Sequence, residues 1–210
     1  MPGACKGASV ALEQYGDEAL MEAYRDGDSR AFEVLLNRHR RPVFSFLLRQ
    51  VGDPTLAEDL LQEAFLRIIR NASSYERRAK FTTWFYTIAR NLCRDHGRRA
   101  KHRKHSSLDA PLSKEEKGGS LGDVVPDKGP QVDRQVMSRR LKGRLEEAIG
   151  QLGPEQREVF LLREGSALSF KQIAEIVGCP ENTVKSRMRY ALDNLRKALE
   201  EYRELATAVQ

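Results

Sequence analysis

The sequence has few cysteines and no long hydrophobic run. Its three cysteines, Cys5, Cys93 and Cys179, lie far apart, whereas a structural zinc site needs about four ligands. Cys93-x-x-His96 is a half-site without a second pair nearby, so we expect no metal and no cofactor. Scattered reduced thiols favour a reducing compartment. Apolar runs are short, such as Phe46–Leu48, so we expect no transmembrane helix and no direct membrane insertion.

Signals for secretion, for strands and for catalysis are also missing. Residues Met1–Leu12 contain one Lys and no continuous apolar segment, unlike a signal peptide, so we expect a cytoplasmic protein. Alternating β-branched runs do not occur, which favours an all-α fold. The sequence has no glycine-rich phosphate loop, no HExxH motif and no serine in a nucleophile elbow. We therefore predict no catalytic residues, no small-molecule substrate and no enzyme activity.

Positive charge is concentrated in one segment. The 210-residue chain has a formal net charge of +6, but residues 76–105 hold ten Lys and Arg against two acids, Glu76 and Asp95. A basic block of this kind favours a polyanionic partner such as nucleic acid. The alternative is a solvated helix end followed by a basic tail, and charge alone does not separate the two.

Helical periodicity divides the chain into two modules. An N-terminal extension covers residues 1–16, a first helical domain covers residues 17–105, and a second covers residues 136–205. Residues 106–135 are rich in Gly, Pro, Ser and acidic residues and follow no period, so we expect a flexible linker. The predicted fold class is all-α, with two small helical domains joined by this linker.

The first domain is predicted to hold several amphipathic helices. One begins near Asp17, and the next is capped by a residue of Asp28–Ser29. Pro42 lies inside that second helix and predicts a kink or a helix junction. A third helix covers Thr55–Arg70, and its acids near the start complement the helix dipole. A protein-docking face is the other explanation of those acids, and the sequence alone does not decide between them.

The last helix of this domain, Phe81–Arg99, mixes aromatic and basic residues in "FTTWFYTIARNLCRDHGRR". Aromatic rings beside cations suit single-stranded nucleic acid, because each stacked base is worth about 1–3 kcal/mol. The preceding loop, residues 73–80, is a candidate pocket for an unstacked base. Core packing of the rings, worth about 1.5–3 kcal/mol per fully buried side chain, is the simpler alternative.

The second domain contains the pattern of a helix-turn-helix. Ser169 and Gln172 form a capping box that opens a helix, and Gly178 ends it because glycine tolerates a positive φ. The next helix starts after Pro180 and carries several basic residues in its first turns, where such helices contact bases and phosphates. An ordinary helical hairpin is the alternative. The stripe expected to pack inward consists of Val184, Met188, Leu192, Leu195 and Leu199.

Four sequence blocks together resemble the extracytoplasmic function sigma factors of the sigma-70 family. They are "AEDLLQEAFLRIIRNASSYE", "FTTWFYTIARNLCRDHGRR", "LGPEQREVFLLREG" and "LSFKQIAEIVGCPENTVKSRMRYALDNLRKAL". The resemblance spans residues 18–199 and implies a first domain like sigma region 2 and a second like region 4. It implies a subunit that binds core RNA polymerase, through its clamp coiled coil and flap, and directs initiation at promoter DNA.

The resemblance also implies which residues make each contact. The residues implied to bind core polymerase are Glu58, Asp59, Leu60, Gln62, Glu63 and Phe65. Those implied to hold the −10 element are Tyr75, Lys80, Trp84, Arg90, Asn91 and Arg94, with Asn91 at a flipped-base pocket. Those implied to read the −35 element are Thr183, Lys185, Ser186, Arg187 and Arg189.

Three further expectations follow from the resemblance. Family members are usually held inactive by an anti-sigma factor, often at the membrane, and the linker would thread toward the RNA exit path. Tyr190 stands where relatives often have a basic residue, which leaves one −35 contact open. The alternatives are a free-standing helix-turn-helix regulator, disfavoured by the strand-opening segment, and a purely protein-binding adaptor, disfavoured by the basic helix.

Overall fold

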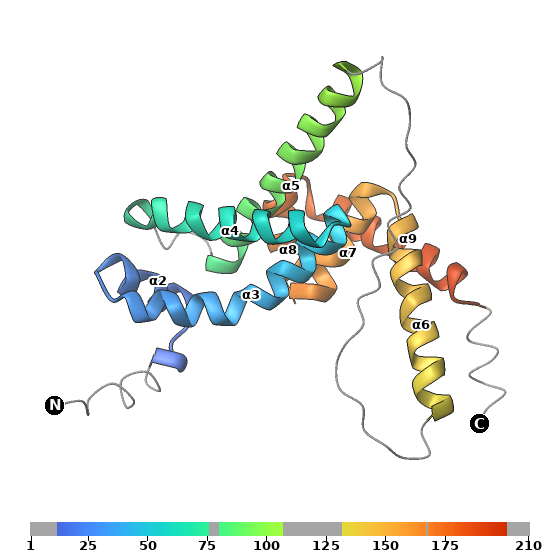
Figure 1. Ribbon diagram of the computed structural model, residues 1–210, viewed down its shortest axis with the longest axis horizontal. Coiled ribbons are helices and arrows are strands. Elements are labelled where there is room, and N and C mark those ends of the chain that lie inside the picture. The colour runs from blue at the N-terminus through green and yellow to red at the C-terminus, as the bar shows by residue number, and fades with distance from the viewer. Residues whose placement is uncertain (1–11, 76–79, 107–131, 167, 201–210) are drawn as a thin grey trace. The chain divides into compact units, whose positions relative to one another are not determined.

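The computed structural model describes residues 12–75, 80–106, 132–166 and 168–200, without the side chains of residues 74, 101–106 and 132–140. All regular structure within these ranges is helical, as predicted (Figure 1). The chain divides into two compact units, Met1–Leu108 with Leu161–Glu181, and Asp109–Phe160 with Asn182–Gln210. The N-terminal extension up to residue 11 and most of the expected linker lie outside the described residues.

Helices succeed one another along the described residues in the following order. They are α2 (Asp17–Arg25), α3 (Ser29–Val51), α4 (Pro54–Arg70), the 3-10 helix η1 (Ala72–Ser74), α5 (Phe81–Ser106), α6 (Val132–Gln151), α7 (Pro154–Ser166), α8 (Phe170–Val177) and α9 (Glu181–Ala198).

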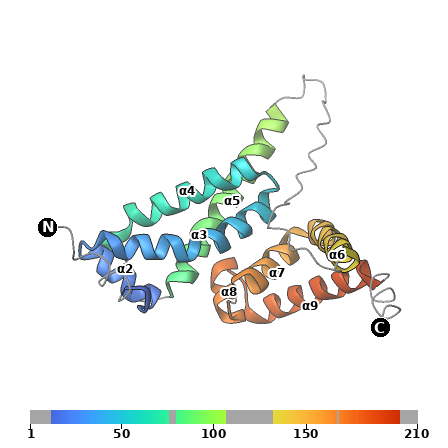
Figure 2. The same cartoon turned by 60° about the horizontal axis from the view of Figure 1, so that its bottom comes forward.

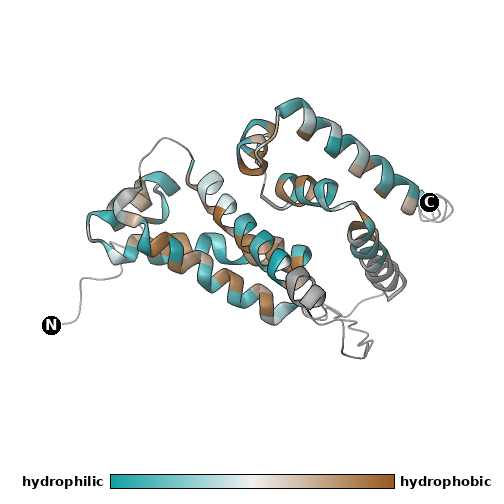
Figure 3. Cartoon of the chain, turned by 90° about the horizontal axis from the view of Figure 1, so that it is seen from above, coloured by the Kyte–Doolittle hydropathy of each residue, from teal (hydrophilic) through white to brown (hydrophobic). Residues whose placement is uncertain are grey.

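In the first unit, α3 and α4 lie side by side and α5 packs against both (Figures 1 and 2). Their shared core contains fully buried residues from all three helices, including Leu35, Ile68, Phe81 and Phe85. Apolar and polar residues alternate around these helices (Figure 3), as expected of amphipathic helices that bury one face. The core fixes the two helices, α4 and α5, on which most of the predicted contacts lie.

Local signals set the ends of α3 and α4. The Asp28 side chain accepts a hydrogen bond from the backbone N–H of Arg30 at 3.1 Å, which confirms the predicted cap. Gly52 ends α3 in the left-handed conformation at φ 74°. Asp53 then caps α4. Pro42 lies inside α3, which continues as one helix, so the alternative of a helix junction at this proline is wrong.

The helix-turn-helix signals are confirmed in the same way. The Ser169 hydroxyl accepts from the Gln172 backbone N–H at 3.3 Å, and the Gln172 side chain accepts from the Ser169 N–H at 3.0 Å. Gly178 ends α8 at φ 68°, a conformation that favours glycine. The capping box and the turn therefore form as the sequence predicts.

Three expectations about these helices need correction. On α9 the buried residues are Val184, Met188, Ala191 and Leu195, whereas Leu192 is 45% exposed. The helical period of 3.6 residues explains this, because it continues the stripe at spacings of four, three and four. Helix α5 extends past Arg99 to Ser106, and α6 begins at Val132, inside the segment 106–135 that was expected to be a linker.

No helix within the described ranges is both long enough and apolar enough to cross a membrane.

Candidate polymerase and promoter interfaces

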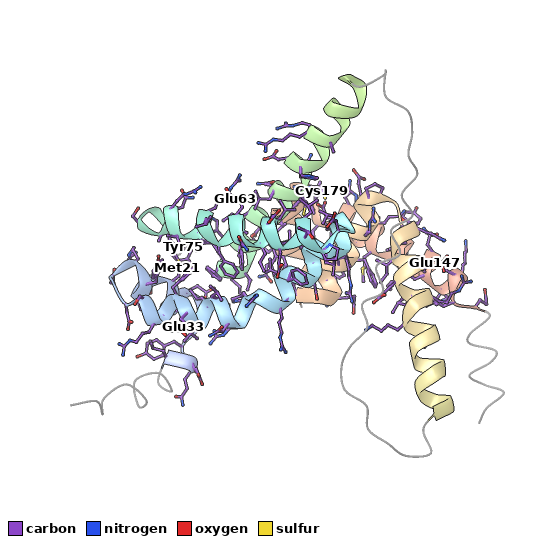
Figure 4. The ribbon with its side chains drawn as sticks, viewed as in Figure 1. Met21, Glu33, Glu63, Tyr75, Glu147 and Cys179 are labelled. Atoms are coloured by element: carbon purple, nitrogen blue, oxygen red, sulfur yellow. The ribbon has the colours of Figure 1, made fainter. Side chains whose placement is uncertain are left out.

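The first candidate interface is the outer face of α4. Glu58, Asp59 and Gln62 are exposed there. Glu63, labelled in Figure 4, accepts a hydrogen bond from Arg67 Nε, and the two atoms lie 3.0 Å apart. The other two residues predicted to bind polymerase, Leu60 and Phe65, are almost fully buried. The polar residues of the predicted set are therefore available at the surface, whereas its two apolar residues mainly support the core.

A hollow of about 370 Å³ lies between α3 and α4. Two large apolar side chains on its α4 side are exposed, Leu66 by 44% and Ile69 by 41%. Neither residue belongs to the set that the resemblance implies to bind core polymerase. The sequence signal that could have identified this surface is the presence of apolar residues outside the stripe that faces the core, which repeats with the helical period of 3.6 residues. The hollow is lined by Phe32, Leu36, Arg40, Glu58, Leu61, Gln62, Phe65, Leu66 and Ile69.

The second candidate interface lies at the start of α5. Tyr75, which follows η1, is almost fully buried, and its ring centroid lies 5.2 Å from that of half-buried Trp84. Trp84 also contacts the Phe81 ring edge-on, with 6.1 Å between centroids. Core packing therefore accounts for Tyr75, while one edge of the aromatic cluster, at Trp84, reaches the surface.

The polar residues predicted for this interface differ in their surroundings. Lys80, Asn91 and Arg94 are exposed. Arg90 is half-buried, and its guanidinium donates to the backbone oxygens of Ile176 at 3.1 Å and Val177 at 3.2 Å, within the same compact unit. Arg90 is therefore held by the last carbonyls of α8, where a cation is favourable.

The third candidate interface is the first half of α9. Lys185, Ser186 and Arg189 are exposed, while Thr183 is half-buried. Arg187 is also half-buried, and its Nη2 pairs with Glu155 Oε2 of α7 at 2.7 Å. The Arg189 guanidinium lies over the Tyr190 ring, 5.2 Å from its centroid, a contact that orients the cation.

Arg187 and Glu155 form a link that sequence reasoning missed. The two residues are far apart in the sequence, and an acidic residue at the start of α7 is explained by the dipole of that helix alone. The Glu155 side chain is 70% exposed, so the pair adds little stability. Its consequence is geometric, because it orients the Arg187 guanidinium toward α7.

An ionic cluster connects α2 to the centre of α3. The two carboxylate oxygens of Asp17 contact Arg38 Nη1 and His39 Nε2, the latter at 2.9 Å. Burial alone would raise the pKa of the Asp17 carboxyl, but the hydrogen bonds and positive charges of His39 and Arg38 outweigh burial and hold this pKa below its ordinary value. His39 is itself buried against the rings of Phe81 and Phe85.

Metal ligands are not gathered anywhere in the part of the chain that the structure describes, since no three His, Cys, Asp or Glu side chains there could hold an ion together. Cys93 and Cys179 are both half-buried.

Two family models match the chain. The model of sigma-70 region 2 matches residues 35–103, and that of sigma-70 region 4 matches residues 142–195. The first match contains α4 and most of α5, and the second contains the helix-turn-helix. The chain thus carries both regions in the order predicted from the sequence blocks.

Curated relatives and solved structures agree with these matches. The RNA polymerase sigma factor CarQ of Myxococcus xanthus is 34% identical over 86% of this chain and 96% of its own length. The sigma-E factor of Escherichia coli is 32% identical over 87% and 95%, and SigW of Bacillus subtilis is 33% identical over 83% and 92%. Both of these relatives are named as extracytoplasmic function (ECF) RNA polymerase sigma factors.

Two solved structures share the fold. The sigma factor RpoE of Bartonella quintana, in complex with the anti-sigma factor NepR, matches with a TM-score of 0.61 at 24% identity over 80% of this chain and 96% of its own. CnrH in complex with the cytosolic domain of CnrY matches with a TM-score of 0.61 at 21% identity over 88% and 97%. With these matches the predicted resemblance is confirmed: the chain belongs to the extracytoplasmic function sigma factors of the sigma-70 family, and it is not an enzyme.

Proposed function

We propose that this protein directs promoter-specific initiation by binding core RNA polymerase through its first domain and recognising the −10 and −35 elements with separate helices. One observation carries the proposal. A single chain combines an exposed apolar and acidic face on α4 with an aromatic and basic face on α5 and a basic helix after a turn. A regulator that binds only duplex DNA would need the basic helix after the turn and neither of the other two faces.

The face of α4 is the proposed docking site for the clamp coiled coil of core polymerase. Leu66 and Ile69 offer apolar surface to a partner helix, and Glu58 and Gln62 at the rim of the same hollow offer polar contacts. An apolar centre within a polar rim is the usual arrangement of a protein interface. In this assignment Leu60 and Phe65 act indirectly, by holding α4 in place.

The exposed side of α5 is the proposed site for the non-template strand of the −10 element. Trp84 provides a ring for base stacking, and Lys80 and Arg94 provide charge for the backbone. Asn91 is exposed and has an amide that can pair with a base edge. Arg90 can hold a phosphate only after its guanidinium leaves the carbonyls of Ile176 and Val177.

The first half of α9 is the proposed reading surface for the −35 element. Lys185, Ser186 and Arg189 are exposed there. In a helix-turn-helix, the N-terminal part of the second helix is the part that contacts bases in the major groove. Of the two arginines, Arg189 has the more accessible side chain, because Arg187 is paired with Glu155. Arg189 is therefore the first choice for a bidentate contact with guanine.

We further propose that an anti-sigma factor controls the protein in the cytoplasm, in some states at the inner face of the membrane. Of the two solved structures with the same fold, the sigma factor RpoE is in complex with the anti-sigma factor NepR, and CnrH is in complex with the cytosolic domain of CnrY. The exposed apolar face of α4 is the candidate surface for both partners, so their binding is mutually exclusive in this proposal. Recovery of one complex that contains this protein, an anti-sigma factor and core polymerase together would contradict it.

Run-off transcription tests the proposed function. Purified protein is added to core RNA polymerase with promoters from the source genome, and transcript start sites are mapped. Specific initiation that depends on this protein is the expected result. Binding to duplex promoter DNA without core polymerase, together with no specific initiation, would instead support a free-standing regulator.

A further inference from the structure

Glu18, in the first turn of α2, caps the start of a helix that lies far along the chain. The Glu18 carboxylate Oε1 accepts a hydrogen bond from the backbone N–H of Phe81 at 3.0 Å. Phe81 is the first residue of α5, and the first N–H groups of a helix have no partner within it. A carboxylate at this end also interacts favourably with the helix dipole.

The helix that carries Glu18 is itself fixed by its neighbour in the sequence. Asp17 bonds Arg38 and His39 of α3, and the His39 ring lies 5.3 Å from the Phe81 ring. The two acids at the start of α2 therefore face different helices: Asp17 binds the middle of α3, and Glu18 binds the start of α5. Together they set where α5 begins relative to α3.

The start of α5 controls the aromatic cluster. Trp84 lies one turn after Phe81 and contacts both the Phe81 and Tyr75 rings, while exposed Lys80 directly precedes the helix. If the first turn frays, all three groups lose their relative positions. The match to sigma-70 region 2 begins at residue 35, so α2 and Glu18 lie outside it.

We propose that Glu18 is a positioning residue for −10 recognition: its carboxylate holds the first turn of α5 so that Trp84 and Lys80 meet the unpaired strand together. The proposal rests on the proposed function of α5. It assigns no DNA contact to Glu18, which acts through the Phe81 N–H.

Three variants separate this role from general destabilisation. Glu18→Ala removes the acceptor, and Glu18→Gln keeps an oxygen that can accept from the Phe81 N–H while removing the charge. Glu33→Ala, at an exposed acid of α3 (Figure 4), is the matched control. All are compared as full chains at a temperature at which circular dichroism shows them folded.

The first measurement uses holoenzyme assembled from each variant and core polymerase. A fluorescein-labelled single strand carries the −10 sequence of a promoter identified by the run-off assay, and anisotropy gives its affinity. Glu18→Ala should weaken binding up to about fivefold, the factor that corresponds to one lost helix cap. Glu18→Gln should recover most of the affinity, and Glu33→Ala should match the wild type. Affinities for core polymerase and for −35 duplex should not change.

The second measurement uses Trp84, the one tryptophan of the sequence, in the free full-length protein. Acrylamide should quench Trp84 fluorescence more strongly in Glu18→Ala than in the wild type, because a frayed first turn exposes the ring. Wild-type affinity in Glu18→Ala, or an equal loss in Glu18→Gln, would overturn the positioning role. Failure of the wild-type holoenzyme to bind the strand would overturn the proposed function of α5 itself.

Discussion

The docking face on α4 makes a quantitative prediction for Leu66 and Ile69. Full burial of a large aliphatic side chain is worth about 1.5–3 kcal/mol. Leu66 is 44% exposed and Ile69 is 41% exposed. Burial of this exposed surface by a partner should therefore contribute about 0.7–1.3 kcal/mol for Leu66 and about 0.6–1.2 kcal/mol for Ile69. Replacing both with serine should therefore weaken binding to core polymerase by about 1.3–2.5 kcal/mol, or roughly 10- to 70-fold.

The assay is a titration of fluorescently labelled full-length protein with core polymerase. Melting curves of the free protein establish a temperature at which the double variant remains folded, since part of each side chain also packs internally. Leu192→Ser is the matched control, because Leu192 is exposed to the same degree, 45%, but lies on α9. The double variant should lose affinity and the control should lose much less.

Two results would refute the reasoning. Unchanged affinity in the Leu66 and Ile69 double variant would mean that this face does not meet polymerase. An equal loss in Leu192→Ser would mean that affinity follows exposed apolar surface in general rather than the α4 hollow. The same double variant should also fail to bind an anti-sigma factor if the two partners share the face.

Three further predictions follow from named contacts. Arg189→Ala should weaken binding to −35 duplex by about 1–3 kcal/mol and relax base preference in mobility-shift assays, and an unchanged preference would exclude Arg189 as a base contact. The pKa of Asp17 is below its ordinary value, so Asp17 contributes stability at neutral pH that is lost as the pH falls below about 4 through the folded-state pKa. Urea unfolding should show this acid loss in the wild type and a smaller one in Asp17→Asn, and equal pH dependence would contradict it. Ser169→Ala removes the cap of α8 and should lower the free energy of unfolding by about 1 kcal/mol, while Ser169→Asp, which keeps an acceptor, should restore it.

The features that could be predicted from the sequence are those that depend on near neighbours in the chain. The caps at Asp28 and Ser169 and the turn at Gly178 each need only residues within a few positions, so their signals are local. The paired arrangement of the two sigma regions was also predictable, because its blocks occur together in one order. The predicted set of buried residues on α9 was wrong at Leu192, because the helical period places Ala191, not Leu192, on the buried face.

The contacts that sequence reasoning missed join residues distant in the chain. Nothing near Glu18 indicates that its carboxylate caps α5, and nothing near Arg187 indicates a pair with Glu155. Each of these acids has an adequate local explanation in the dipole of its own helix. When the dipole of its own helix already explains an acidic residue, the sequence gives no further reason to expect a contact with a distant residue.

Burial divides the predicted contact residues into those that can meet a partner and those that hold them in place. On α4, Leu60 and Phe65 support the core while Leu66 and Ile69 remain exposed. At the start of α5, buried Tyr75, which follows η1, supports the ring of Trp84. A substitution at a supporting residue lowers stability and partner affinity together, whereas one at an exposed residue lowers affinity with a smaller loss of stability. Measuring both quantities for each variant is therefore what distinguishes a contact from its support, and affinity alone does not.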